Sequence, residues 1–136
     1  MAEKPDEIKV SLKITDFNCD PNSISEILGL EPTTTWLEGD RVHPKAIIKH
    51  KQNGWVLQSP LPKETPFRQQ LQTLLDMVTP KKQQLLNLPS GTDIEVSCVV
   101  YSEHGRPDIS LEPDMVAAIA EMRAGLDFDL YTLADD

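Results

Sequence analysis

Residues 8–14 read Ile-Lys-Val-Ser-Leu-Lys-Ile, a strict alternation of apolar and polar side chains. Successive side chains of a β-strand point to opposite faces, so this alternation predicts a half-buried strand. A second run with the same period extends from Ile94 to Val100, with Glu95, Ser97 and Val99 facing outward. The two runs predict a single sheet that amphipathic segments cover.

Amphipathic helices are the expected cover of this sheet. From Phe67 to Val78, apolar side chains recur at the i, i+4, i+7, i+8 and i+11 positions of one helical face. A further apolar helical stripe follows Pro113 and consists of Met115, Val116, Ile119 and Met122. Proline suits the first turn of a helix, and it also marks the expected starts at Pro21 and Pro80.

Shorter apolar stretches predict the remaining strands. The segment 45–52 reads as a strand, and Asn53-Gly54 after it is a strong signal for a two-residue hairpin turn. Such a turn would place four side chains together on one face of the hairpin, namely Ile48, His50, Trp55 and Leu57. Further strands are expected at 109–111 and 128–133.

The order of these elements predicts an α+β fold. We expect a mainly antiparallel sheet of five to six strands with three to four helices packed on it. A strand, a proline-started helix, Gly-Leu and an extended segment occur near 8–36 and again near 109–131, which favours two ferredoxin-like halves. The chain has 136 residues, which fits one domain over 1–136, with 1–7 and 135–136 expected to be loose.

The charge of the chain is uneven. The formal net charge is −9, yet residues 41–82 carry eight basic and two acidic residues, whereas residues 103–136 carry nine acidic and two basic ones. Nucleic-acid binding needs a net basic face, so we expect no nucleic-acid partner. The basic segment either mixes with acidic neighbours on a solvated surface or forms a local anion site.

Membrane association is not expected. The chain has no apolar run of about 18 residues, which a transmembrane helix would need. The first seven residues are charged and lack the apolar core of a signal peptide. A cytoplasmic location is therefore expected.

The common catalytic motifs are missing from the sequence. The three histidines lack metal-site spacing, there is no G-x-S-x-G motif, and the six glycines are dispersed singly. We therefore expect no catalytic residue, no metal and no cofactor. Cys98 is expected to act as a small apolar residue on its strand, and Cys19 is expected to be inert rather than reactive.

The candidate binding residues are few, and each has a structural alternative. Trp36 lies in a threonine-rich segment and serves recognition or packing, whereas Trp55 is expected in the core. Asp40 and Arg41 follow a glycine and either contact a ligand or form a turn. A ligand site near them would include His43 and Lys45. At the end of the chain, Asp127, Asp129 and Tyr131 share one face of a strand, which is either a binding site or a solvated surface.

Several of these segments together resemble the bacterial domain-of-unknown-function family 4279. The resemblance rests on L-G-L-E-P-T (Leu28 to Thr33), Gly39-Asp40, G-W-V-L (Gly54 to Leu57), the leucine-rich helices and L-D-F-D-L-Y (Leu126 to Tyr131). It covers Ile8 to Tyr131 and implies a small cytoplasmic α+β domain. The recurring family features map onto Gly39, Asp40, Trp55, Asp127 and Tyr131, and they imply no activity.

Three functions follow as hypotheses. The first is a non-catalytic protein-binding module, an adaptor or a toxin-immunity protein, because negative charge speeds the capture of a basic partner. The second is a domain that binds a small anionic ligand in the region from Trp36 to Trp55, beside Asp40 and Tyr131. The third is an enzyme that uses Asp127 or Asp129 with a histidine. Either a monomer or a homodimer is compatible with the sequence.

Overall fold

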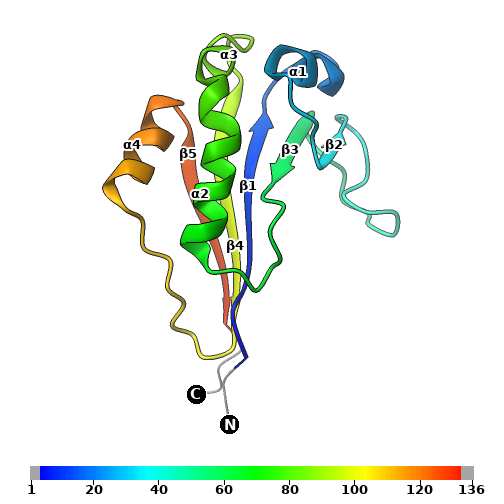
Figure 1. Ribbon diagram of the computed structural model, residues 1–136. Coiled ribbons are helices and arrows are strands. Elements are labelled where there is room, and N and C mark those ends of the chain that lie inside the picture. Colours follow the sequence, from blue (N-terminus) through cyan, green and yellow to red (C-terminus); the bar gives the residue numbers. More distant parts are fainter. Residues whose placement is uncertain (1–3, 133–136) are drawn as a thin grey trace.

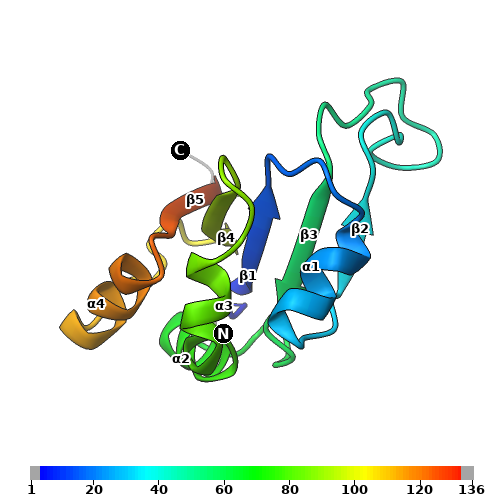
Figure 2. The same cartoon turned by 90° about the horizontal axis from the view of Figure 1, so that it is seen from above.

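The computed structural model describes residues 4–132 and contains one mixed sheet with helices on one of its faces (Figures 1 and 2). The strands are β1 (Glu7–Thr15), β2 (Thr34–Trp36), β3 (Gly54–Gln58), β4 (Asp93–Ser102) and β5 (Gly125–Thr132). The helices are α1 (Pro21–Leu28), α2 (Phe67–Val78), α3 (Lys82–Leu86) and α4 (Pro113–Glu121), with a 3-10 turn η1 (Thr79–Lys81). The predicted α+β class with a mainly antiparallel sheet is confirmed.

The sheet has the order β2-β3-β1-β4-β5. All neighbours are antiparallel except β4 and β5, which are parallel and joined through α4. The first part of the chain, β1-α1-β2-β3-α2-β4, is therefore one ferredoxin-like unit in which β3 lies between the parallel strands β1 and β2. Two such halves were expected, but the second part of the chain adds only α4 and β5.

The core lies between the sheet and the helices. The central strand β1 contributes Ile8, Val10, Leu12 and Ile14, all at most 4% exposed. The predicted stripe of α2 packs over them, and Phe67, Leu71, Leu74, Leu75 and Val78 are all buried. The opposite residues of β1, such as Lys9 and Lys13, are exposed or half-buried on the uncovered side. The alternation along β1 thus gives the sheet one face that is buried under the helices and one face that is exposed to solvent.

One buried polar residue ties the loop before α2 to β1. Gln70 is 1% exposed although it lies in the apolar stripe of α2. Its amide nitrogen donates to the backbone oxygens of Ile8, Thr65 and Pro62, at 2.8, 3.0 and 3.4 Å. The Pro62 carbonyl also accepts from Thr65 N, and the bonds from Gln70 join this loop to β1 and stabilise the turn into the helix.

The predicted strand at 45–52 and the Asn53-Gly54 hairpin turn are wrong. Both edges of β3 are taken, by β1 and β2, so no edge remains for segment 45–52. Gly54 is instead the first residue of β3, and the side chain of Asn53 accepts from Glu38 N and donates to Cys19 O. Ile48 and His50 consequently do not share a face with the buried Trp55 and Leu57.

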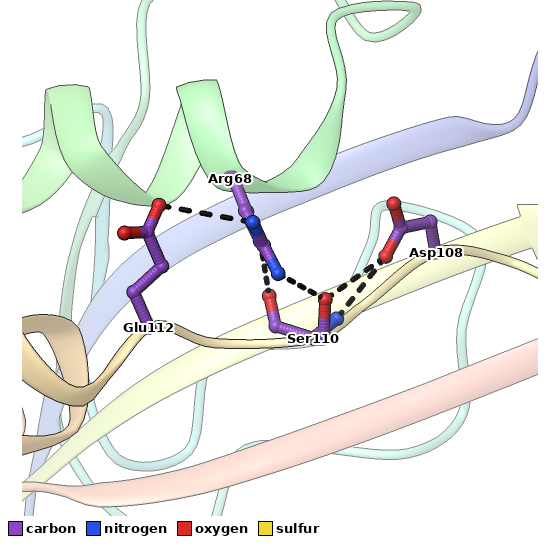
Figure 3. Close-up of polar contacts among 4 residues, drawn as sticks. All are labelled: Arg68, Asp108, Ser110 and Glu112. Atoms are coloured by element: carbon purple, nitrogen blue, oxygen red, sulfur yellow. Dashed lines mark hydrogen bonds and ion pairs between the residues drawn. The ribbon is translucent and has the colours of Figure 1, made fainter.

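The predicted strand at 109–111 is also wrong. The edge of β4 that it would need is occupied by β5, and Ile109 and Leu111 pack partly buried against the core. Residues 103–112 join β4 to α4 and are called the crossover segment. Figure 3 shows how Arg68 of α2 contacts part of it. Arg68 Nε donates to the Ser110 carbonyl at 3.1 Å and Nη2 to the Ser110 hydroxyl at 2.7 Å, while Nη1 lies 3.7 Å from Glu112. The Ser110 hydroxyl in turn donates to Asp108.

Residues 4–7 have contacts that the sequence did not predict. Residues 1–7 were expected to be loose, but Glu7 belongs to β1 and Lys4 lies 3.7 Å from Glu103. The Asp6 carboxylate also has a close partner, His104 Nε2 at 3.1 Å. The expectations for residues 1–3, Leu133 and 135–136 fall outside the described residues.

The contact between Trp36 and Gly54 gives the first testable prediction. The Trp36 ring lies so close over Gly54 that a Cβ atom there would overlap it. We expect Gly54→Ala to lower the free energy of unfolding by about 1–3 kcal/mol, the usual cost of overpacking. In a Trp36→Ala background the same change should cost little, because the overlap is gone. Urea titrations followed by circular dichroism measure both values.

Gly125→Ala is the matched control for this double-mutant cycle. Gly125 also lies in a strand, but the nearest atom to its added Cβ is Ile94 O at 4.0 Å. We expect this change to have almost no cost. An equal cost of Gly54→Ala in both backgrounds would contradict the role assigned to the Trp36 ring.

Candidate functional site

The uncovered face of the sheet carries three of the seven candidate residues, namely Trp36, Asp127 and Tyr131. Strand register aligns its side chains in rows, for example Gln58, Ser11, Ser97 and Asp127 in one row and Lys9, Val99 and Asp129 in the next. We call this surface the open face. Its central strands β1 and β4 carry small polar and charged side chains, and aromatic side chains lie toward its two edges.

Trp36 dominates the β2 edge of the open face. Its ring covers Gly54 and stacks on His50, with centroids 4.4 Å apart and planes 16° apart. The indole Nε1 donates to Gln52 O at 3.0 Å, and Lys13 Nζ lies 6.0 Å from the ring centroid. A cation near an aromatic face is attracted to it. Trp36 thus fixes the beginning and the end of the segment that follows β2.

Residues 41–52, which make up most of the connection between β2 and β3, are called the basic loop. It contains four cationic residues and no acidic one, and it projects beyond β2, away from the helices (Figures 1 and 2). An isolated antiparallel bridge joins Arg41 to Lys49, flanked by backbone bonds from Val42 N to Ile48 O and from His50 N to Asp40 O. Ile47 and Ile48 are 95% and 70% exposed.

The structure brings some of the candidates near this loop together and separates others. Trp36, Asp40, Arg41 and His50 line one open hollow of about 470 Å³ together with Thr34, Thr35, Val42 and Pro44. His43 is not among its lining residues. The Asp40 carboxylate accepts from Leu37 N at 2.8 Å, which is the turn role considered for it. Arg41 Nη1 donates to Pro44 O at 3.4 Å.

Trp55 lies on the other side of the sheet. It is fully buried, and its Nε1 donates to Ser25 Oγ at 2.9 Å. Adjacent positions in strand pairs alternate faces, and Trp36 is aligned with Gly54, so the two tryptophans point to opposite faces. The predicted core role of Trp55 is confirmed, and the two rings do not line one pocket. Tyr131, on β5, lies at the opposite edge of the sheet from Asp40.

The β5 edge of the open face is acidic. Asp127 and Asp129 are exposed there, and Asp129 accepts a 2.8 Å hydrogen bond from the Tyr131 hydroxyl. This bond raises the pKa of Tyr131, because loss of the phenolic proton would leave two negative groups side by side. The Tyr131 ring stacks on Tyr101 of β4 with centroids 4.8 Å apart.

Glu95 extends the negative charge inward from β5. Partial burial raises its pKa, the nearby Asp127 adds to the effect, and Lys13 opposes it. Cys98 lies on the core side of β4, the strand that also carries Glu95. Burial, and then the charges of Asp127 and Glu95, raise the pKa of its thiol to about 12. The thiol is therefore protonated and apolar in character, as expected from the sequence.

Exposed apolar side chains accompany this charge. Leu126 and Leu130 of β5 and Val116 of α4 are 40%, 48% and 54% exposed. Val116 belongs to the predicted apolar stripe of α4, but it is exposed and lines an open hollow together with Leu111, Ile119, Ala120, Ala124 and Leu126. We call the set Val116, Leu126, Asp127, Asp129, Leu130 and Tyr131 the acidic edge.

The third hypothesis required a histidine beside Asp127 or Asp129. Each described histidine has another neighbour: His50 stacks on Trp36, and His104 Nδ1 accepts from Arg106 N while its Nε2 faces Asp6. His43 accepts, through its carbonyl oxygen, from Ala46 N in the basic loop. Among residues 4–132, no group of three or more His, Cys, Asp or Glu side chains is arranged to hold a metal ion.

Sequence reasoning missed two features of this surface. The pairing of Asp6 with His104 joins residues about a hundred positions apart, and neither shows a local motif. The exposed apolar character of the acidic edge was also missed, because periodicity assigns Val116 and Leu130 to covered faces. Only the edge position of β5, which is a property of the sheet order, explains their exposure.

Comparison with known proteins identifies the family. The family model described as "Domain of unknown function (DUF4279)" matches residues 6–133, nearly the whole chain. The chain therefore belongs to this family, and the resemblance seen in the sequence is confirmed. No curated protein and no solved structure matches the chain. Within residues 4–132, no helix has the length and apolar character that crossing a bilayer demands.

The raised pKa of Glu95 gives a pH-dependent prediction. A carboxyl group whose pKa is higher in the folded than in the unfolded state favours folding when protonated and opposes it when ionised. We expect Glu95→Gln to stabilise the protein at pH 7, by less than about 1 kcal/mol because the site is only partly buried. The gain should shrink as the pH falls toward the ordinary value of 4.5.

Urea titrations of wild type and Glu95→Gln from pH 7 down to pH 4 measure this difference. Glu31→Gln serves as the control, because Glu31 is an exposed acid outside the sheet. A gain that is independent of pH, or a loss at pH 7, would contradict the assigned electrostatic cause.

Proposed function

We propose that the protein is a non-catalytic protein-binding module of the adaptor or toxin-immunity type. The observation that carries this proposal is the composition of the acidic edge. Apolar and acidic side chains alternate along β5, and the strand has a neighbour on one side only within the described sheet. An unpaired strand edge is a ready site for another chain. The cytoplasm, expected from the sequence, is the proposed setting.

The charge of the acidic edge selects the partner. Asp127 and Asp129 are exposed, and the effect of Asp127 on the pKa of Glu95 reports a concentration of negative charge on this part of the open face. Opposite charge steers encounter and raises association rates, so the proposed partner is a basic protein. Leu126, Leu130 and Val116 supply the apolar area that such a contact would bury.

Affinity capture from native lysate tests this proposal. We expect the wild type to retain a basic protein in stoichiometric amount at about 0.01 M salt and to release it at about 1 M, where charges are screened within a few ångströms. Asp127→Asn with Asp129→Asn should lose this protein, whereas Glu31→Gln with Glu38→Gln, a pair of acids outside β5, should keep it. Retention by all variants alike, or no partner at low salt, would refute the proposal.

A second candidate function is the binding of a small anionic ligand beside Trp36. The observation in its favour is the hollow in which the Trp36–His50 stack and the Arg41 guanidinium lie together, close to the other cations of the basic loop. An aromatic plane beside a guanidinium suits a planar, negatively charged molecule. This candidate uses Trp36, Arg41 and His50 and omits Trp55 and Tyr131.

Thermal-shift measurements with nucleotides, inorganic phosphates and sugars test this second function. We expect an anionic aromatic compound to raise the melting temperature of the wild type and to have a much smaller effect on Arg41→Ala. Arg106→Ala is the control, since Arg106 is exposed in the crossover segment after β4. A shift that persists in Arg41→Ala, or no shift with any compound, would rule out this site.

A further inference from the structure

The basic loop has the composition of a strand but lacks a place in the sheet. Residues 45–51 read Lys-Ala-Ile-Ile-Lys-His-Lys, and their only ladder contact is the single bridge between Arg41 and Lys49. Ile47 and Ile48 are the two most exposed large apolar residues among those described. Exposed apolar side chains on a protruding segment mark an interaction site.

The backbone of this loop has one free edge. Ile48 O and His50 N bond inward, to Val42 N and Asp40 O. Alternate residues of an extended segment direct their backbone groups to opposite sides, so Lys49 directs its amide and carbonyl outward. Among residues 4–132, Ile47, Lys49 and Lys51 take part in no loop backbone hydrogen bond. A further strand can pair at Lys49, and extending the pairing requires the loop to straighten at its bends at residues 47 and 51.

The acidic edge offers the complementary pattern. Along β5, Asp127 and Asp129 lie on the open face, whereas Leu126 and Leu130 lie on the side of α4. If the loop straightens beside β5 with Lys49 and Lys51 on the open face, Ile47 lies on that face with them and Ile48 falls on the side of the leucines. This alternation places Lys49 and Lys51 near the carboxylates and Ile48 near the leucines, whereas the other alternation moves both lysines to the side of the leucines.

We propose that the basic loop of one copy adds as a strand to the acidic edge of a second copy. The proposal uses the surface put forward above for a basic partner, but it does not require that a foreign partner exists. The loop and β5 lie at opposite edges of the sheet (Figure 1), so each copy carries one donor and one acceptor. The contact is head to tail, and longer chains of copies form as the concentration rises.

A twofold contact between two β5 strands is the less favourable alternative. An antiparallel pair centred on Phe128 would oppose Asp127 of each copy with Asp129 of the other, and like charges placed opposite each other are destabilising. The basic loop brings the opposite charge to the same edge. A loop occupying its neighbour's β5 would also exclude a basic partner, so the association would regulate the proposed binding function.

Sedimentation velocity on two complementary variants tests this inference. Lys49→Glu damages the donor loop and leaves β5 intact, whereas Asp127→Lys damages β5 and leaves the loop intact. At about 0.01 M salt, we expect the wild type to associate with rising concentration and each variant to have an association constant at least about tenfold lower. A 1:1 mixture of the two variants should recover association, because the intact loop of one variant meets the intact β5 of the other, and the two reversed charges also attract each other.

The controls match the change in charge. Arg106→Glu and Glu31→Lys alter the net charge by the same amounts at exposed sites outside both surfaces, and both should associate like the wild type. A wild type that stays monomeric at low salt, a mixture that does not associate, or variants that associate normally would each overturn the inference. Association of the mixture without capture of any foreign protein would refute the proposed function alone, and the reverse result would refute the self-association alone.

Discussion

The structure depends on the burial of one face of the central strand β1. Ile8, Val10, Leu12 and Ile14 are at most 4% exposed, and each fully buried aliphatic side chain contributes about 1.5–3 kcal/mol. The helices of residues 4–132 all lie on that face (Figure 2), and this part of the chain leaves the other face uncovered. Because polar and apolar side chains alternate along β1, β4 and β5, the uncovered face is polar enough to stay in contact with water. The same alternation leaves the open face available for binding.

A second constraint keeps the basic loop outside the sheet. Trp36 covers Gly54 and bonds to Gln52 O, so the chain leaves β2 and returns to β3 at one fixed point. The twelve residues of the loop can then neither join β3, whose edges are full, nor collapse into the core on the far side of the sheet. Exposure of Ile47 and Ile48 is thus a consequence of packing at the base of the loop.

The elements that the sequence predicted well are those whose pattern is decided locally. The alternation at 8–14 and the stripe at 67–78 need no knowledge of distant residues. The predictions at 45–52 and 109–111 failed because a strand also needs a free neighbouring edge, and β2 and β5 had taken those edges. The same reason explains the site: sequence could name Trp36, Arg41, Asp127 and Tyr131, but only the sheet order shows that they form two separate surfaces.

The order of the sheet turns an uneven sequence charge into an electric polarity of the molecule. Basic residues 41–52 follow β2, and acidic residues 127 and 129 lie in β5, and these two strands are the outermost ones. If the edges had been adjacent, their charges would have neutralised each other within one copy. Because three strands separate them, the basic residues of the loop are kept apart from Asp127 and Asp129 within one copy. The carboxylates on this exposed edge also disfavour pairing between two β5 strands, because like charges repel. The same carboxylates attract a strand that carries positive charge.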